Sequence, residues 1–223
     1  MDDRLARARL YLLATTAVSR RPLLDAVSLV LDAGVDVVQL REKTMADGEF
    51  LELADDLRLL CEVRGALFVV NDRVEVARIV GADGVHLGQE DLGVAQARKL
   101  LRAGTAVGVS THDAAELSRA LEDRADYVGV GSVFPTSTKG RDVAVSGPEA
   151  LAALAILAEG AGVPAFAIGG ITVRNATEVV SAGFRRLAVC AGILGESDPG
   201  AAARVFRQVL DGKRTEPGTN HQR

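Results

Sequence analysis

Short apolar runs alternate along the chain with longer segments whose apolar residues recur at helical spacing. Their Val, Ile and Leu residues are continuous rather than alternating with polar ones, which is typical of strands covered on both faces in a parallel sheet. Most of the segments between the runs end in glycine, near the position where a helix C-cap favours a left-handed residue. Eight runs have the length of a strand: Leu10–Thr15, Val35–Leu40, Ala66–Val70, Gly84–Gly88, Ala106–Ser110, Tyr127–Ser132, Ala165–Gly170 and Leu187–Gly192.

The order of these elements predicts the fold. Eight strand–helix units follow one another without a break in composition. We therefore predict a closed (β/α)8 barrel, or TIM barrel, in a single α/β domain over residues 1–212. A doubly wound open sheet is the alternative, because counting strands does not establish closure. Residues 213–223 are polar and lack any period, so we expect them to form a frayed C-terminal tail.

Composition narrows the class of protein. Of the 223 residues, 48% are hydrophobic and 25% charged, which is ordinary for a globular domain. The formal charge of −4 argues against non-specific binding to nucleic acid or to an anionic membrane. Two cysteines, Cys61 and Cys190, are too few for a disulfide framework, and we find neither a signal peptide nor a stretch that could span a membrane. We expect a cytoplasmic protein.

Polar residues follow many of the predicted strands, at the end of the barrel where such enzymes carry their active sites. Arg41, Lys43 and Lys139 bring three cations to one rim of an acidic protein, and such a cluster suits a diphosphate. Asp72 and Asp91 follow neighbouring strands and could share one Mg²⁺ ion, which commonly takes one or two carboxylates together with phosphate oxygens.

A second sub-site is predicted after the last two strands. Gly169-Gly170 and Ala191-Gly192 stand where barrels often bind a phosphate through backbone N–H groups. Two sub-sites imply two phosphorylated ligands. Purely structural explanations remain open for each position: charged strand-end residues are often only solvated, Asp72 could cap the next helix, and Gly-Gly could form a tight turn.

Six motifs, taken together, resemble the thiamine phosphate synthase family. They occur in the family's order and spacing within roughly Leu10 to Leu210, and the combination is far more specific than any one of them. The motifs are QLREK at 39–43, VNDR at 70–73, GVHLGQED at 84–91, GVSTH at 108–112, DYVGVGSVFPTSTK at 126–139 and AIGGI at 167–171.

The resemblance implies a Mg²⁺-dependent transferase of thiamine biosynthesis that joins two small phosphorylated substrates. It would condense 4-amino-5-hydroxymethyl-2-methylpyrimidine diphosphate with 4-methyl-5-(2-phosphooxyethyl)thiazole and release diphosphate. Neither nucleic acid nor a membrane is an expected partner, and a homo-oligomer is compatible with the sequence. The implied pyrimidine diphosphate contacts are Gln39, Leu40, Arg41, Glu42, Lys43, Asn71, Ser110 and Lys139, with Arg41, Lys43, Ser110 and Lys139 as catalytic residues. The implied thiazole phosphate contacts are Thr136, Ser137, Thr138, Gly170, Cys190 and Ala191, and the implied metal ligands are Asp72 and Asp91.

Four residues at three sites depart from the family pattern. Thr15 stands where the family usually has Asp, Ser132 where it has Pro, and Cys190-Ala191 where it has Val-Ser. Two other functions remain as alternatives, namely a thiazole tautomerase-like relative and a non-catalytic phosphate-binding barrel. The intact cations argue against the first, and the two retained carboxylates argue against the second.

Overall fold

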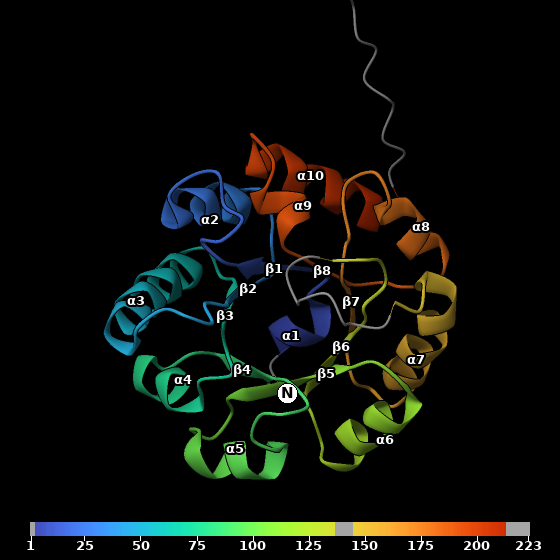
Figure 1. Ribbon diagram of the computed structural model, residues 1–223, viewed down its shortest axis with the longest axis horizontal. Coiled ribbons are helices and arrows are strands. Elements are labelled where there is room, and N and C mark those ends of the chain that lie inside the picture. The colour runs from blue at the N-terminus through green and yellow to red at the C-terminus, as the bar shows by residue number, and fades with distance from the viewer. Residues whose placement is uncertain (1–2, 137–144, 213–223) are drawn as a thin grey trace, which may run out of the picture.

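The computed structural model describes residues 3–136 and 145–212. Within these ranges eight parallel strands pair in chain order, and β8 pairs back onto β1 to close a barrel (Figure 1). Closure confirms the predicted (β/α)8 fold and excludes the open doubly wound sheet. The strands are β1 (Leu10–Ala14), β2 (Val37–Leu40), β3 (Leu67–Asn71), β4 (Gly84–Leu87), β5 (Ala106–Thr111), β6 (Tyr127–Val130), β7 (Ala165–Ile168) and β8 (Leu187–Val189).

Helices form a ring around the strands in Figure 1, as expected when each parallel strand is followed by a crossover helix. None of the helices within the described residues is both long and apolar enough to cross a membrane. The predicted tail, residues 213–223, lies outside the described residues. The helices are α1 (Asp3–Arg7), α2 (Leu23–Asp32), α3 (Asp47–Val63), α4 (Val74–Val80), α5 (Val94–Leu100), α6 (Ala114–Glu122), α7 (Pro148–Gly160), α8 (Ala176–Ser181), α9 (Ala191–Leu194) and α10 (Pro199–Leu210).

Side chains alternate between two packed layers along each strand. On β1, Leu10 and Leu12 pack in the layer between strands and helices, whereas Tyr11 and Leu13 point into the barrel. The same period of two on β2 sends Val38 outwards and leaves Val37 inside. Interior positions near the carboxyl ends of the strands are therefore the ones that can reach a site at the barrel mouth.

Aromatic side chains fill the middle of the barrel. Phe166 makes edge-on contacts with Tyr11 and Tyr127, with ring centroids 5.2 and 5.9 Å apart. Gly108 on the neighbouring strand is required by this packing, because a Cβ atom there would lie 2.0 Å from a carbon of the Tyr127 ring. The buried side chains of Tyr11 and Tyr127, packed with Phe166, therefore fill the barrel interior.

The short helix α1 lies across the middle of the ring in Figure 1 and covers the amino-terminal end of the barrel. Leu5 and Ala8 are 2% and 1% exposed and join the interior cluster. Arg4 forms an ion pair of 2.7 Å with Asp83. We did not predict this helix from the sequence.

Candidate functional site

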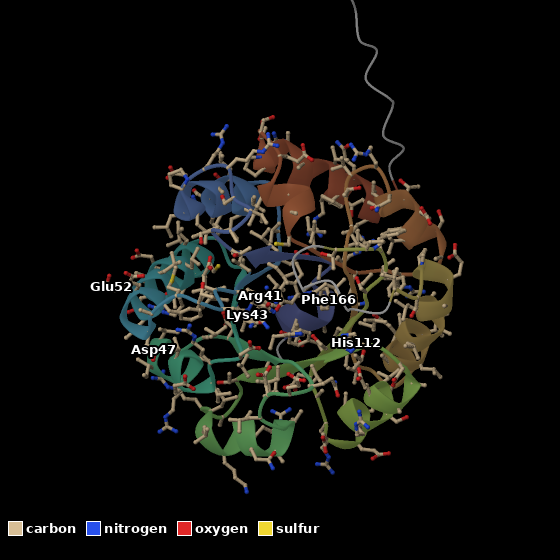
Figure 2. The ribbon with its side chains drawn as sticks, in the orientation of Figure 1. Arg41, Lys43, Asp47, Glu52, His112 and Phe166 are labelled. Carbon is tan, nitrogen blue, oxygen red and sulfur yellow. The ribbon has the colours of Figure 1, made fainter. Side chains whose placement is uncertain are left out.

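The carboxyl ends of the strands surround several adjoining hollows. Among the hollows formed by the described residues, Arg41 lines three. Arg41 directly follows β2 and lies two residues after Gln39, so both side chains belong to the interior face. Figure 2 shows Arg41 and Lys43 near the middle of the ring. A ligand in any of these hollows therefore meets the same guanidinium group.

The first hollow, which we call the polar hollow, contains about 1060 Å³ of empty space. It brings together cations, carboxylates and neutral hydrogen-bonding groups from β2, β3, β4 and β5. Of the residues expected at the diphosphate and metal sub-site, it collects Arg41, Lys43, Asn71, Asp72, Asp91 and Ser110. Lys139, expected to join them, lies outside the described residues.

Asp72 and Asp91 form a hydrogen-bonded pair of carboxyl groups in this hollow. Burial raises the pKa of Asp72 to about 6, and the hydrogen bond and charge of Asp91 act in the same direction. Lys43 and Arg41 oppose the increase. Asp72 adopts a left-handed backbone conformation with φ of +61°, which Asp tolerates better than most residues and which turns it into the site.

This pair fits a divalent cation. Two carboxylates held together repel each other unless a proton or a cation lies between them, and Mg²⁺ would relieve that repulsion. The described residues contain no group of three or more His, Cys, Asp or Glu side chains that could hold a metal. A cation at Asp72 and Asp91 would thus take its remaining ligands from substrate oxygens and water, as Mg²⁺ usually does.

Two contacts that sequence reasoning missed orient the ends of β4 and β5. Gln89 donates from Nε2 to the carbonyl oxygen of Ser110 at 2.6 Å. Glu116 accepts from the backbone N–H of His112 at 2.8 Å and contacts its Nδ1 at 2.7 Å. The four-residue spacing of His112, just before α6, and Glu116, within it, is the only signal of this pair in the sequence.

The second hollow, which we call the apolar hollow, contains about 610 Å³ of empty space. Its walls come from the ends of β6, β7 and β8, and Arg41 joins it to the polar hollow. The residues expected at the thiazole phosphate that line it are Thr136, Gly170, Cys190 and Ala191. Ser137 and Thr138 lie outside the described residues.

Glycines let the loops of the apolar hollow pack closely. Gly170 has a φ of +62°, and a Cβ atom there would lie 2.4 Å from the carbonyl oxygen of Pro135. A Cβ atom on Gly192 would lie 2.3 Å from the carbonyl oxygen of Ile171. Asn175 donates to the carbonyl oxygen of Gly170 at 3.0 Å and accepts from the N–H of Thr172 at 2.7 Å, which fixes the loop after β7.

The third hollow, which we call the floor hollow, holds about 350 Å³ and lies over a chain of buried polar groups. Gln39 contacts the Tyr11 hydroxyl at 2.8 Å, and the two tyrosine hydroxyls are 3.0 Å apart. His86 then bridges Tyr127 and Ser110 at 3.2 and 3.0 Å. Sequence reasoning assigned no function to the two tyrosines, which lie in apolar runs and meet only in the closed barrel.

Gln39 carries an unsatisfied acceptor. Its side chain is 2% exposed, and its Oε1 atom has no hydrogen-bond partner among the described residues. A buried polar atom without a partner costs about 1–3 kcal/mol, so such atoms in a site are candidates for ligand contact.

Two residues expected at the pyrimidine diphosphate, Leu40 and Glu42, are not among those that line the three hollows. Leu40 is fully buried in the layer between strands and helices, because it is one residue out of phase with Gln39, so its side chain points away from the hollows. Glu42 accepts a hydrogen bond from the backbone N–H of Thr16 and so ties the end of β2 to the loop after β1.

The residues that depart from the family pattern have structural contacts. Thr15 is 3% exposed, and its Oγ1 accepts from the N–H of Ala17 at 3.3 Å. Ser132 donates to the carbonyl oxygen of Phe134 at 2.7 Å and so holds the loop after β6. Burial raises the pKa of the Cys190 thiol to about 11, which keeps it a neutral wall of the apolar hollow.

A family model described as thiamine monophosphate synthase matches residues 10–193. The thiamine-phosphate synthase of Chlorobium luteolum is 40% identical over 196 residues, which cover 88% of this chain and 91% of that protein. The thiamine-phosphate synthase of Synechococcus sp. WH7803 is 46% identical over 84% of this chain, but the match covers only 52% of that relative. The chain thus spans about half the length of several relatives that it matches.

Solved structures are similar over nearly the whole chain. A thiamine phosphate pyrophosphorylase from Pyrococcus furiosus has a TM-score of 0.84 and 34% identity, covering 95% of this chain and 98% of that one. A 3-hexulose-6-phosphate synthase has a TM-score of 0.67 at 22% identity, covering 90% of this chain and 99% of that one. The second likeness establishes only that the barrel is shared.

Proposed function

The chain belongs to the thiamine monophosphate synthase family, and from this premise we propose that it is a transferase that joins a pyrimidine diphosphate to a thiazole phosphate. The substrates would be 4-amino-5-hydroxymethyl-2-methylpyrimidine diphosphate and 4-methyl-5-(2-phosphooxyethyl)thiazole, and the products thiamine monophosphate and diphosphate. We propose a cytoplasmic location, in keeping with Cys61 and Cys190, both of which are free thiols.

The proposal rests chiefly on one observation, the Asp72–Asp91 pair facing Arg41 and Lys43 across the polar hollow. Mg²⁺ held by the two carboxylates would, when bound, neutralise charge on the diphosphate oxygens. Arg41 and Lys43 would bind the same oxygens and stabilise the negative charge that grows as the diphosphate leaves. By family resemblance, Lys139 would add a third cation.

The aminopyrimidine would lie in the floor hollow. The unpartnered Oε1 of Gln39 is an acceptor for the 4-amino group, while Asn71 and Ser110 line the same hollow as neutral hydrogen-bonding groups. The thiazole phosphate would lie in the apolar hollow, against the backbone of Gly170 and Ala191 and the Thr136 side chain. Arg41 lines both of these hollows.

The proposed chemistry needs no protein nucleophile. The amino group of the pyrimidine donates electron density to the ring, so the C–O bond to diphosphate can break before the thiazole nitrogen bonds to the methylene carbon. The chain's task is to hold the two rings in line and to exclude water from the methylene cation. The neutral Cys190 thiol agrees with a site that does not use covalent catalysis.

Release of diphosphate tests the proposal. Purified protein with both substrates and Mg²⁺ should release diphosphate, and omission of the thiazole phosphate or of Mg²⁺ should reduce the release at least about a hundredfold. Arg41→Ala and Lys139→Ala should each lower kcat/KM for the pyrimidine diphosphate more than for the thiazole phosphate. The opposite ranking would mean that the two sub-sites are interchanged.

A further inference from the structure

We propose that the buried chain of hydrogen bonds under the floor hollow fixes which way the Gln39 amide faces and thereby selects a ring that carries an amino group. Tyr11, Tyr127 and His86 line the base of the same hollow, and we assign them as positioning residues because their hydrogen bonds end on Gln39 and Ser110. The inference rests on the proposed function, which assigns Gln39 to the aminopyrimidine.

The direction of the hydrogen bonds is set first at Gln39. Its Nε2 atom donates to the Tyr11 hydroxyl oxygen at 2.8 Å. The Tyr11 proton is then directed to its other neighbour, the Tyr127 hydroxyl at 3.0 Å. Burial raises the pKa of both tyrosines well above the ordinary value, so both phenols stay protonated and remain donors.

The series of hydrogen bonds continues in the same direction through His86. Tyr127 can donate its proton to Nδ1 of His86, which lies 3.2 Å from the hydroxyl. An imidazole that accepts at Nδ1 carries its proton on Nε2 when neutral, and that atom lies 3.0 Å from Oγ of Ser110. Each group thus donates to the next one, from the Gln39 amide to the wall of the floor hollow.

This polarity opposes rotation of the amide. If the Gln39 amide turned over, Oε1 would need a donor at the position now occupied by the Tyr11 oxygen. The Tyr11 proton is already directed to Tyr127, so the whole chain would have to reverse. The amide therefore keeps Nε2 on Tyr11 and leaves Oε1, which is buried and unpartnered, as an acceptor for the ligand.

The expected consequence is discrimination by hydrogen-bond polarity. An amino group on the ring donates to Oε1 of Gln39 and satisfies it. A ring with a carbonyl oxygen at the same position would set one acceptor against another and leave both unsatisfied. Sites that present a buried polar group reject analogues that cannot pair with it far more strongly than apolar pockets reject a change in size.

Binding of two unreactive analogues tests the proposal. Both carry a methylene bridge in place of the oxygen that leaves with the diphosphate; one has the 4-amino group and the other a 4-oxo group. Calorimetry on the purified protein with Mg²⁺ should give a preference for the amino analogue of about a hundredfold or more. Tyr11→Phe should lower this preference to about tenfold or less, because the amide can then turn and offer Nε2 to the carbonyl.

Two further variants separate positioning from general packing. Val37→Ala truncates a fully buried interior side chain on the strand of Gln39, so it should lower thermal stability and leave the preference unchanged. Tyr127→Phe keeps the Gln39–Tyr11 contact but lets the Tyr11 proton point back at the amide, so it should also lower the preference. This variant provides the test if Tyr11→Phe does not fold.

The outcomes can be told apart. If the folded Tyr11→Phe or Tyr127→Phe protein keeps the wild-type preference, or if Val37→Ala lowers the preference equally, the positioning role is refuted while the proposed function stands. If the wild-type protein binds neither analogue, the proposed function fails and the inference fails with it.

Discussion

At the scale of single residues, the carboxyl pair is the feature on which the proposed chemistry depends most. Asp72 is half-buried and hydrogen-bonded to Asp91, and the cations Arg41 and Lys43 in the same hollow act to lower its pKa. Residue type alone predicted that the two carboxylates would meet, because they follow neighbouring parallel strands. The left-handed backbone of Asp72 and its elevated pKa depend on packing, and the sequence carries no sign of them.

Removal of one carboxylate should disable the reaction and leave the fold intact. Asp72→Asn and Asp91→Asn are each expected to lower kcat by about a hundredfold or more at ordinary Mg²⁺ concentration, because the metal ion proposed to neutralise the leaving diphosphate would lose a carboxylate ligand. Diphosphate release measures the effect. Asp56→Asn, an exposed carboxylate on α3, is the matched control and should behave like the wild type. Full activity of either site variant would exclude the metal assignment.

The elevated pKa of Asp72 gives a stability prediction for the metal-free protein. The folded state holds the Asp72 proton up to about pH 6, whereas the unfolded chain releases it near the ordinary pKa of about 4. Between these values the folded state binds more protons, so this group's contribution to stability increases as the pH falls from 6 to 4. In the presence of a chelator, lowering the pH from 6 to 4 should therefore raise Tm more, or lower it less, in the wild type than in Asp72→Asn. Parallel pH profiles of the two proteins would contradict the elevated pKa.

Ala191 tests how the thiazole phosphate is held. If backbone N–H groups after β7 and β8 supply most of the binding, the serine hydroxyl usual in the family is a secondary contact. A hydrogen bond to a charged group contributes about 1.5–3 kcal/mol at most, and less where water can replace it. Ala191→Ser should therefore lower KM for the thiazole phosphate by about tenfold or less, with kcat nearly constant. A hundredfold rise in kcat would contradict this explanation.

At the scale of elements, the apolar runs predicted all eight strands, and the differences at their ends have physical causes. The run Ala165–Gly170 continues past β7, which stops at Ile168 because Gly169 and Gly170 have φ of +106° and +62°. The run Leu187–Gly192 overlaps α9, which begins at Ala191. The helix α1 was missed because five residues are too few to show a helical period.

The buried chain beneath the site was beyond sequence reasoning for a different reason. Tyr11 and Tyr127 lie in runs that read only as apolar strands, and their hydroxyls meet because β1 and β6 face each other across the barrel interior. Only closure of the barrel brings strands so distant in the chain together. The residues that we propose for the diphosphate and the metal were easier to bring together from the sequence, since they lie at or near strand ends.

Gly170 tests the packing of the loops after β6 and β7. Gly170→Ala should destabilise the protein by about 1–3 kcal/mol, because its Cβ atom would lie 2.4 Å from the Pro135 carbonyl oxygen and its φ is positive. KM for the thiazole phosphate should rise as well, since the loop lines the apolar hollow. Gly183→Ala is the control: its φ is +118°, but no atom lies within 4 Å of the added Cβ. Equal effects of both variants on KM would contradict the role of this loop contact.

At the scale of the whole molecule, the barrel separates stability from chemistry. The amino-terminal end is sealed by α1, where Leu5 is buried and Arg186 donates to the carbonyl oxygen of Ala6 at 2.8 Å. The opposite end carries the hollows lined by Arg41. Substitutions at the sealed end should therefore change the free energy of unfolding without changing the site.

Leu5→Ala tests this separation. Truncation of a leucine that is 2% exposed should lower the free energy of unfolding by about 2–4 kcal/mol in a denaturant titration. We expect kcat/KM for both substrates to stay within about twofold of the wild type at temperatures where the variant is folded. Leu59→Ala, on a leucine 50% exposed on α3, should change stability by less than about 0.5 kcal/mol. A loss of activity in folded Leu5→Ala would show that the two ends are coupled.

The central claim is that one barrel mouth holds both substrates and joins them. Chromatographic analysis of a single reaction mixture tests it most directly, by quantifying thiamine monophosphate and diphosphate together over time. We predict that the two products appear in a ratio of about one to one, and that replacement of Asp72 by Asn slows the appearance of both by about a hundredfold or more. Diphosphate that accumulates without thiamine monophosphate would indicate a hydrolase, and would contradict the proposal that the two hollows bind partners of one reaction.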